Sequence, residues 1–228
     1  MKKYFIYLML LFWGCNLSST AHFLHPEYAG SRRFSTTILI MPLTPYFLEP
    51  HVWDSLCTTQ QIELIRPGHQ EMTYFNNYFG PLVSEYSTAD VIGIDPFFRT
   101  RGIAFRQDNL LFEDNTTVDI LVPDSGHISY RSRVPDFVLF TQDLKFEKDF
   151  VEERNGIGEG TTSKYTMVAS IKYLFWDNRR NRIAGYGRLQ NRRQMMDYPG
   201  KSTYLDVLDE FVREMVDNSP LVRRHIRQ

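Results

Sequence analysis

Cysteine is scarce in this 228-residue chain, which has only Cys15 and Cys57. Small secreted folds that lack a large core are held together by several disulfides, and two cysteines cannot supply such a framework. The chain is long enough for one sizeable domain, so its stability must come from a packed apolar core. Cys57 is therefore expected to act as a small buried apolar residue rather than as a reactive thiol.

Net charge is also nearly absent. The sequence has 26 basic and 27 acidic residues. Lys2 and Lys3 belong to the N-terminal segment that is predicted below to be removed, and without them the basic count falls to 24 and the formal charge is −3. Proteins that bind nucleic acid through its phosphates usually carry a clear excess of positive charge. No nucleic-acid partner is predicted.

Apolar runs of membrane-spanning length are missing as well. The segment Tyr4–Trp13 has ten residues, whereas a helix needs about 20 apolar residues to cross a bilayer. This segment follows Lys2 and Lys3 and ends directly before Gly14, which is the layout of a secretory signal peptide. Residues 1–14 are therefore predicted to be a signal peptide that is removed on export.

The end of this signal resembles the lipobox of bacterial lipoproteins, in the residues Leu11-Phe12-Trp13-Gly14-Cys15. The resemblance implies that Cys15 becomes a lipidated N-terminal residue, and Asn16 differs from the Asp that commonly retains such proteins at the inner membrane. It therefore implies anchoring in the bacterial outer membrane, facing the periplasm. The following residues to Arg33 are polar and irregular, so residues 15–33 are predicted to form a lipidated tether.

Apolar periodicity predicts one domain over residues 34–219, with alternating or continuous apolar runs as strands and apolar stripes at helical spacing as helices. The predicted helix Tyr204–Asp217 has Ser202 or Thr203 as its N-cap. The predicted helix Gln70–Tyr86 should kink or break at Gly80-Pro81. Residues 220–228 are expected to form a mobile basic tail. The predicted strands are Thr36–Leu43, Asp90–Phe98, Ile103–Phe112, Thr117–Val122, Asp136–Phe150, Tyr165–Trp176 and Ile183–Gln190, and the predicted helices are Gln70–Tyr86 and Tyr204–Asp217.

The last three predicted strands follow one another closely, which indicates an antiparallel meander. Their shared apolar face needs a cover, and the apolar stripe of Tyr204–Asp217 supplies one. The predicted fold class is therefore α/β in the α+β sense: a single, antiparallel-dominated mixed sheet with helices packed on one face.

This order of elements resembles a group of bacterial envelope proteins: the curli-secretion-channel lipoprotein, the penicillin-binding-protein activators and the TolB amino-terminal domain. The resemblance is carried by Ile38-Leu39-Ile40-Met41-Pro42, by Asp136-Phe137-Val138-Leu139, by Met167–Trp176 with its charged turn, and by the apolar-striped last helix. It implies a non-catalytic envelope protein that works by contacting other proteins.

Arginine is concentrated around the turn that follows Trp176. One interpretation is a patch for an acidic partner, a lipid headgroup or an anionic cell-wall polymer. The other is a solvated hairpin tip whose arginines pair with Glu147, Asp149, Glu152 and Glu153 of the neighbouring strand. The residues concerned are Arg179, Arg180, Arg182, Arg188, Arg192 and Arg193.

Catalytic and metal-binding patterns are weak. The loop Gly156–Thr162 is flanked by strand patterns and by acidic residues, so a flexible hairpin connection fits it better than a phosphate-binding loop. His22 and His25 have no further ligands nearby. Asp124-Ser125-Gly126-His127 has the composition of a turn. No catalytic residue, metal or cofactor is predicted.

The leading functional hypothesis is a non-enzymatic envelope lipoprotein that serves as an accessory, scaffold or assembly subunit of a cell-envelope protein complex. Its partners would be the membrane, through the lipid, and one or more envelope proteins, without a small-molecule substrate. Two alternatives remain open at this point. One is a secreted or periplasmic hydrolase that uses His127 with Ser125 or a carboxylate pair, and the other is a binding module for an anionic envelope polymer.

Overall fold

A computed structural model describes most of the chain. The described residues are 20–30, 36–42, 47–48, 69–92, 103–124, 126–154, 161–195 and 201–223. The predictions for Cys15, Cys57, Ser125, the glycine-rich loop at residues 156–160 and the tail beyond residue 223 lie outside the described residues.

One mixed sheet forms the centre of the fold, with the described strands in the order β1-β9-β8-β7-β2-β4 and with β3 also paired to β7. The three long strands form the predicted antiparallel meander, and β2, β3 and β4 join it in parallel. The strands are β1 (Ala21–Leu24), β2 (Thr37–Pro42), β3 (Phe47–Leu48), β4 (Asp90–Ile92), β7 (Phe137–Arg154), β8 (Thr161–Asp177) and β9 (Arg182–Met195).

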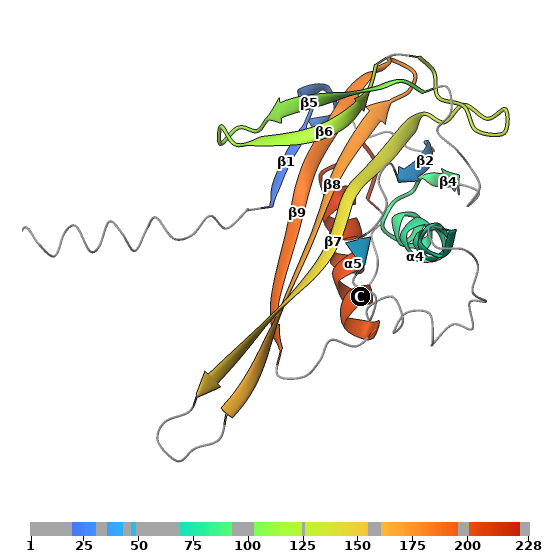
Figure 1. The fold of residues 1–228 in the computed structure, drawn as a ribbon. Helices are drawn as coiled ribbons and strands as arrows, with labels where there is room; N and C mark the ends of the chain where they lie inside the picture. The colour runs from blue at the N-terminus through green and yellow to red at the C-terminus, as the bar shows by residue number, and fades with distance from the viewer. Residues whose placement is uncertain are drawn as a thin grey trace, which may run out of the picture.

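Helices cover one face of this sheet. α4 (His69–Tyr86) and α5 (Lys201–Asp217) lie side by side on it, as Figure 1 shows. Phe79 and Val83 of α4 and Val212 of α5 are buried in the same cluster as the sheet residues facing them. The predicted fold class, an α+β sheet with packed helices, is confirmed.

The prediction for α4 is a kink or a break at Gly80-Pro81, and the break does not occur, because Pro81 lies inside one continuous helix. Proline removes a backbone donor, which costs one hydrogen bond of the preceding turn. Phe79 and Val83, on either side of Pro81, are both buried against the sheet. This packing holds the two halves of the helix on the same surface.

A second, two-stranded sheet covers part of the opposite face. The hairpin of β5 (Phe105–Leu111) and β6 (Thr117–Pro123) alternates strictly in β6, where Val118, Ile120 and Val122 are buried. These side chains pack on the faces of the long strands that point away from the helices. The long strands are therefore buried on both faces near the hairpin and are open on one face beyond it (Figure 1).

The N-terminal tether is shorter than predicted. Ala21–Leu24 forms the edge strand β1, which pairs antiparallel with β9. The four-residue helix α2 (Pro26–Ala29) follows, and its Tyr28 is 1 % exposed in the main core. A four-residue strand has no readable period, and its partner lies far along the chain, so local sequence gives no sign of the pairing.

The C-terminal boundary also moves outward. Leu221 is fully buried, and the guanidinium Nε of Arg223 lies 3.0 Å from Oδ1 of Asp217. Residues 220–223, predicted as the start of a mobile tail, therefore belong to the folded domain.

Gly187 is required by close packing inside the sheet. A Cβ at this position would lie 2.6 Å from the ring of Tyr173, which is fully buried and has no room to move. We expect Gly187→Ala to lower the free energy of unfolding by about 1–3 kcal/mol, measured by chemical denaturation. Gly30→Ala is the control, since nothing lies within 4 Å of its added Cβ. Equal stability of the two variants would contradict the packing described.

Candidate functional site

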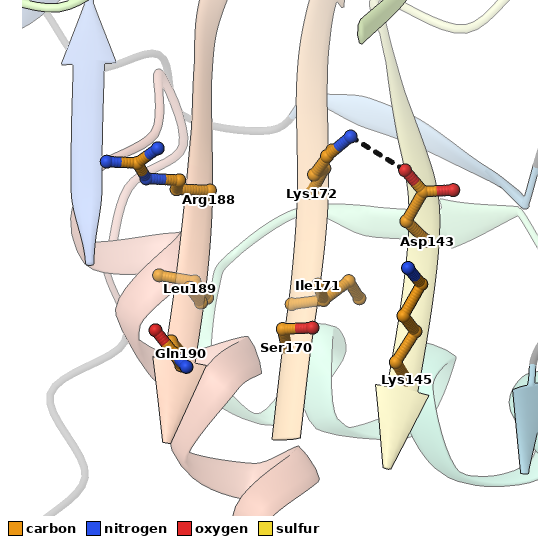
Figure 2. A pocket seen from close by; sticks show the side chains of 8 residues that line it. All are labelled: Asp143, Lys145, Ser170, Ile171, Lys172, Arg188, Leu189 and Gln190. Atoms are coloured by element: carbon orange, nitrogen blue, oxygen red, sulfur yellow. Dashed lines mark ion pairs between the residues drawn. The ribbon is translucent and has the colours of Figure 1, made fainter. Parts of the chain in front are cut away.

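A polar hollow lies on the open face of the long strands, next to the β5–β6 hairpin. Its volume is about 190 Å³, and Figure 2 shows its side chains spread over β7, β8 and β9. The residues that line it are Asp143, Lys145, Ser170, Ile171, Lys172, Arg188, Leu189 and Gln190.

An irregularity in β7 shapes the hollow. The register with β8 shifts between Gln142 and Lys145, and Asp143 has a φ of 50°, a left-handed conformation that Asp tolerates better than most residues. Such bulges re-aim side chains at the point where they occur. Here the bulge places the Asp143 carboxylate 2.7 Å from Nζ of Lys172 on β8, as seen in Figure 2.

Hydrogen bonds attach the β5–β6 hairpin to the sheet, and two of them come from residues that line the hollow. The buried Gln142 amide accepts from the backbone N–H of Leu121 at 2.8 Å and donates to its carbonyl at 2.9 Å. Lys172 donates to the carbonyl of Asp119 at 3.0 Å. Arg188 donates to the carbonyl of Thr117 at 3.3 Å. The hairpin is therefore held in place by side chains of all three long strands.

The hollow is positively charged. Lys145, Lys172 and Arg188 supply three cations against the single carboxylate of Asp143. Lys145 is exposed, and it has no ion-pair partner among the described residues. Lysine and arginine are donors only, so an anion is the ligand that this set of side chains can hold.

The chain enters the domain beside this hollow. Oγ1 of Thr20 accepts from the backbone N–H of Gln190 at 3.2 Å and lies 3.3 Å from its carbonyl. The next residue, Ala21, pairs with Arg188. Two residues that line the hollow therefore mark the place where the N-terminal segment joins the sheet.

The six predicted arginines do not form one patch. Arg180 and Arg182 pair with Glu27 of α2, Arg179 pairs with Asp136, and Arg193 pairs with Glu210 of α5. Only Arg188 lines the hollow, and Arg192 is exposed further along the same strand. The predicted pairing with acids of the neighbouring strand is not the arrangement found for these four ion pairs, whose partners come from other elements.

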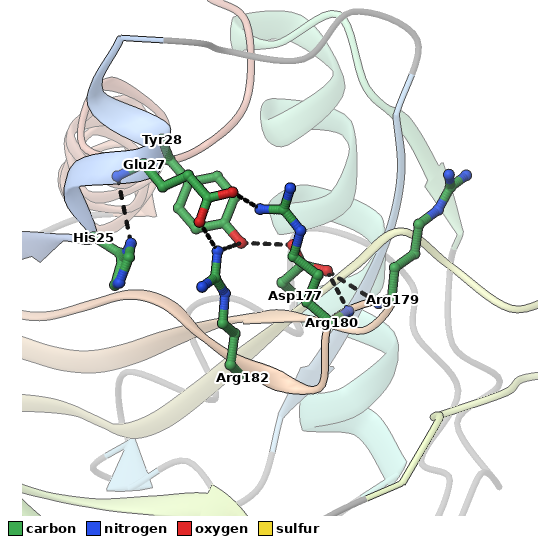
Figure 3. A network of polar contacts seen from close by, with 7 residues as sticks. All are labelled: His25, Glu27, Tyr28, Asp177, Arg179, Arg180 and Arg182. Carbon is green, nitrogen blue, oxygen red and sulfur yellow. Dashed lines mark hydrogen bonds and ion pairs between the residues drawn. The ribbon is translucent and has the colours of Figure 1, made fainter.

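A polar network joins α2 to the β8–β9 turn (Figure 3). The Tyr28 hydroxyl donates to Asp177 at 2.5 Å, and Asp177 accepts the backbone N–H groups of Arg179 and Arg180 at 3.0 and 2.9 Å. The hydrogen bond from Arg182, with the nearby charge of Arg180, lowers the pKa of Glu27. Burial and the bond to Asp177 raise the pKa of Tyr28. These arginines therefore secure the turn and α2.

A second polar group links β1, β8 and α5. Nδ1 of His22 lies 2.7 Å from the Tyr173 hydroxyl, and Nε2 lies 2.9 Å from Oε1 of Glu214. A carboxylate only accepts, so in the neutral imidazole Nε2 carries the proton and the Tyr173 hydroxyl donates to Nδ1. Burial raises the pKa of Tyr173 well above its usual value, which keeps this hydroxyl protonated as the donor.

His127 is hydrogen-bonded to the protein backbone. Its Nδ1 is 2.6 Å from the carbonyl of Asn178, and the Asn178 amide bonds the backbone of Ile128 in both directions. This arrangement stabilises the loop before β7. Within the described part of the chain, no group of three or more His, Cys, Asp and Glu side chains is placed to hold a metal ion, and no described helix is long and apolar enough to cross a membrane.

Neither a family model nor a curated protein matches the sequence. Several solved chains match the structure, and two of them are as follows. A dodecamer of a PelC point variant from Paraburkholderia phytofirmans is 9% identical, with 88% of this chain and 97% of that chain covered and a TM-score of 0.40. A putative neuraminyllactose-binding hemagglutinin homolog from Helicobacter pylori is 6% identical, with 81% and 84% covered and a TM-score of 0.37. Likenesses this low say nothing about what the chain binds.

The His22 group should contribute to stability. His22→Ala removes the partner of the buried Tyr173 hydroxyl, so we expect the free energy of unfolding to fall by about 1–3 kcal/mol. The loss should be smaller in a Tyr173→Phe background, where no hydroxyl is left unpaired. His25→Ala, which removes the 3.4 Å bond to the backbone N–H of Glu27 and an edge contact with the Tyr28 ring, is the control for loss of a histidine outside this group. An equal cost of His22→Ala in both backgrounds would refute the described bond.

The Glu27 ion pairs should make stability depend on pH. Because the folded-state pKa of Glu27 lies below its usual 4.5, its charge stabilises the fold above about pH 4.5 and this contribution is lost as the pH falls further. We expect the difference in Tm between the wild-type chain and Glu27→Gln to be positive at pH 7 and to shrink below pH 4.5. Glu85→Gln, a change at an exposed glutamate on α4, is the matched control for the removal of one carboxylate. A Glu27→Gln difference that is constant from pH 7 to pH 3 would contradict the assignment.

Proposed function

We propose that this chain is an exported lipoprotein, anchored at Cys15 in the outer membrane, whose domain is a non-enzymatic accessory subunit of a cell-envelope protein complex. The observation that carries this proposal is the long β7–β8 hairpin, whose far end projects beyond the helices and beyond the β5–β6 hairpin (Figure 1). A projecting hairpin of this kind is suited to contact another protein.

The far end of the hairpin is a two-stranded ribbon. Among the described residues, β9 last pairs with β8 at Tyr165, opposite Met195, whereas β7 and β8 continue to pair until Arg154 meets Thr161. Two-stranded ribbons are marginally stable on their own in water. Their unpaired edges also offer backbone N–H and C=O groups to a further strand. A partner that docks on the ribbon would stabilise it and would pair its free backbone groups.

The proposed anchor places the domain close to a membrane. Cys15 is five residues before Thr20, which is held on β9, so the linking segment spans at most about 17 Å. The ribbon lies at some distance from this point, because Arg154 is nine residues beyond Lys145 along β7, or about 30 Å in an extended strand. The domain would thus be held at the membrane and would reach a partner with its ribbon.

The hydrolase alternative has less support. Nδ1 of His127 is hydrogen-bonded to the backbone carbonyl of Asn178. The Asn178 side chain beside it is bonded to the backbone of Ile128 and Pro135. A catalytic histidine would need a nucleophile and an orienting carboxylate instead. The non-enzymatic interpretation is therefore retained.

The proposal is tested by shortening the ribbon. Phe150 pairs directly with Tyr165, so residues 151–164 can be replaced by Asn-Gly, which forms a tight two-residue hairpin turn. We expect the shortened protein to keep its Tm within a few degrees, because the removed residues lie beyond the last described pair of β8 with β9, Tyr165 with Met195. It should lose the envelope proteins that co-purify with the full chain from membranes after crosslinking.

Two further readouts separate the parts of the proposal. Mass spectrometry of the N-terminal peptide should find a lipid on Cys15 and none in Cys15→Ala. Recovery of the full chain alone from several mild detergents, or the same partners with the shortened ribbon, would refute the role of the ribbon.

A further inference from the structure

The hollow on the open face of the sheet has a chemistry that points to one kind of ligand. Its cations come from three neighbouring strands, Lys145 from β7, Lys172 from β8 and Arg188 from β9, and Ser170 and Gln190 add neutral hydrogen-bonding groups (Figure 2). A phosphate accepts hydrogen bonds through several oxygens, so it can meet donors that approach from different strands. A single carboxylate, Asp143, opposes this charge and is itself bound to Lys172.

The size of the hollow limits the ligand. Its volume of about 190 Å³ is below the ~300–1,000 Å³ of pockets that enclose drug-sized ligands. It can take one phosphate ester with its immediate substituent, and it is too small to enclose several residues of a polymer. The lining is also rigid, because the side chains sit on long paired strands and not on loops.

The position of the hollow decides the source of the phosphate. Thr20 and Ala21 join the sheet opposite Gln190 and Arg188, and both of these partners line the hollow. Given the proposed anchor at Cys15, the acyl chains would enter the membrane within about 17 Å of this place. Lipid phosphates at the membrane surface are then the anions nearest to the hollow and are present at high local concentration.

We propose that this hollow binds the phosphate of an anionic lipid headgroup, with Lys145 and Lys172 as its main contacts. The inference rests on the proposed function for the nearness of the membrane. Binding there would fix the orientation of the domain on the bilayer, since lipid and protein would meet at two points, the acylated Cys15 and the hollow. A single point of attachment alone leaves the domain free to rotate.

The test uses the full chain purified from membranes in a non-ionic detergent. Dihexanoyl phosphatidylglycerol is titrated below its micelle concentration and binding is measured by calorimetry, with dihexanoyl phosphatidylcholine and inorganic phosphate as parallel probes. We expect saturable binding of the phosphatidylglycerol, weakened about fivefold by Lys145→Ala and further by the double change of Lys145 and Lys172 to Ala. Asp143→Asn should tighten binding, because it removes the opposing charge and Asn still tolerates the left-handed backbone.

The matched control is Arg213→Ala. Arg213 is exposed on α5, which packs on the other face of the sheet, so this change removes one positive charge without touching the hollow. Equal weakening by Arg213→Ala and Lys145→Ala would overturn the site, since it would reflect only net charge. Inorganic phosphate binding as tightly as the phosphatidylglycerol would overturn the lipid as its source. These results do not depend on whether Cys15 is acylated or the ribbon has a partner, so they can fail separately from the proposed function.

Discussion

The antiparallel pairing of β7, β8 and β9 is the constraint on which the rest of the structure depends. Near the hairpin turn after Trp176 these strands carry apolar side chains on both faces, such as Leu139 and Phe140 in β7. A sheet of this kind must be covered twice. The helices α4 and α5 cover one face and the β5–β6 hairpin covers the other, and where the hairpin ends the second face becomes polar and forms the hollow.

The boundary between covered and open sheet coincides with the bulge at Asp143. On one side of it, Gln142 holds the hairpin through two backbone hydrogen bonds. On the other side, Lys145 faces solvent. An extra residue in β7 thus lets Leu144 and Phe146 stay in the helix-side core while a charged surface begins on the opposite face. The bulge at Asp143 thus separates the part of the sheet that is covered on both faces from the part that is proposed to bind a phosphate.

Most long elements were predictable from sequence because their signals are local. The meander, the first strand at Ile38–Ile40 and the final helix follow from runs and periods of apolar residues. The hollow was not predictable from sequence, because its cations are scattered along three strands. The only hint was the arginine-rich stretch that contains Arg188. Arg180 and Arg182 misled for the same reason: their partner Glu27 lies 155 residues before Arg182, and no local pattern reveals such a contact.

The edge pairing of β1 with β9 bears on the order in which the parts of the domain fold. Thr20 and Gln190 are 170 residues apart, and closing so large a loop carries an entropic cost that only the finished sheet offsets. A chain that is exported from its N-terminus presents Ala21–Leu24 long before β9 exists. During that interval this segment lacks its partner strand, so we expect its docking to be a late step of folding. With the proposed acylation of Cys15, attachment would precede closure of the sheet, and the domain would assemble already beside the membrane.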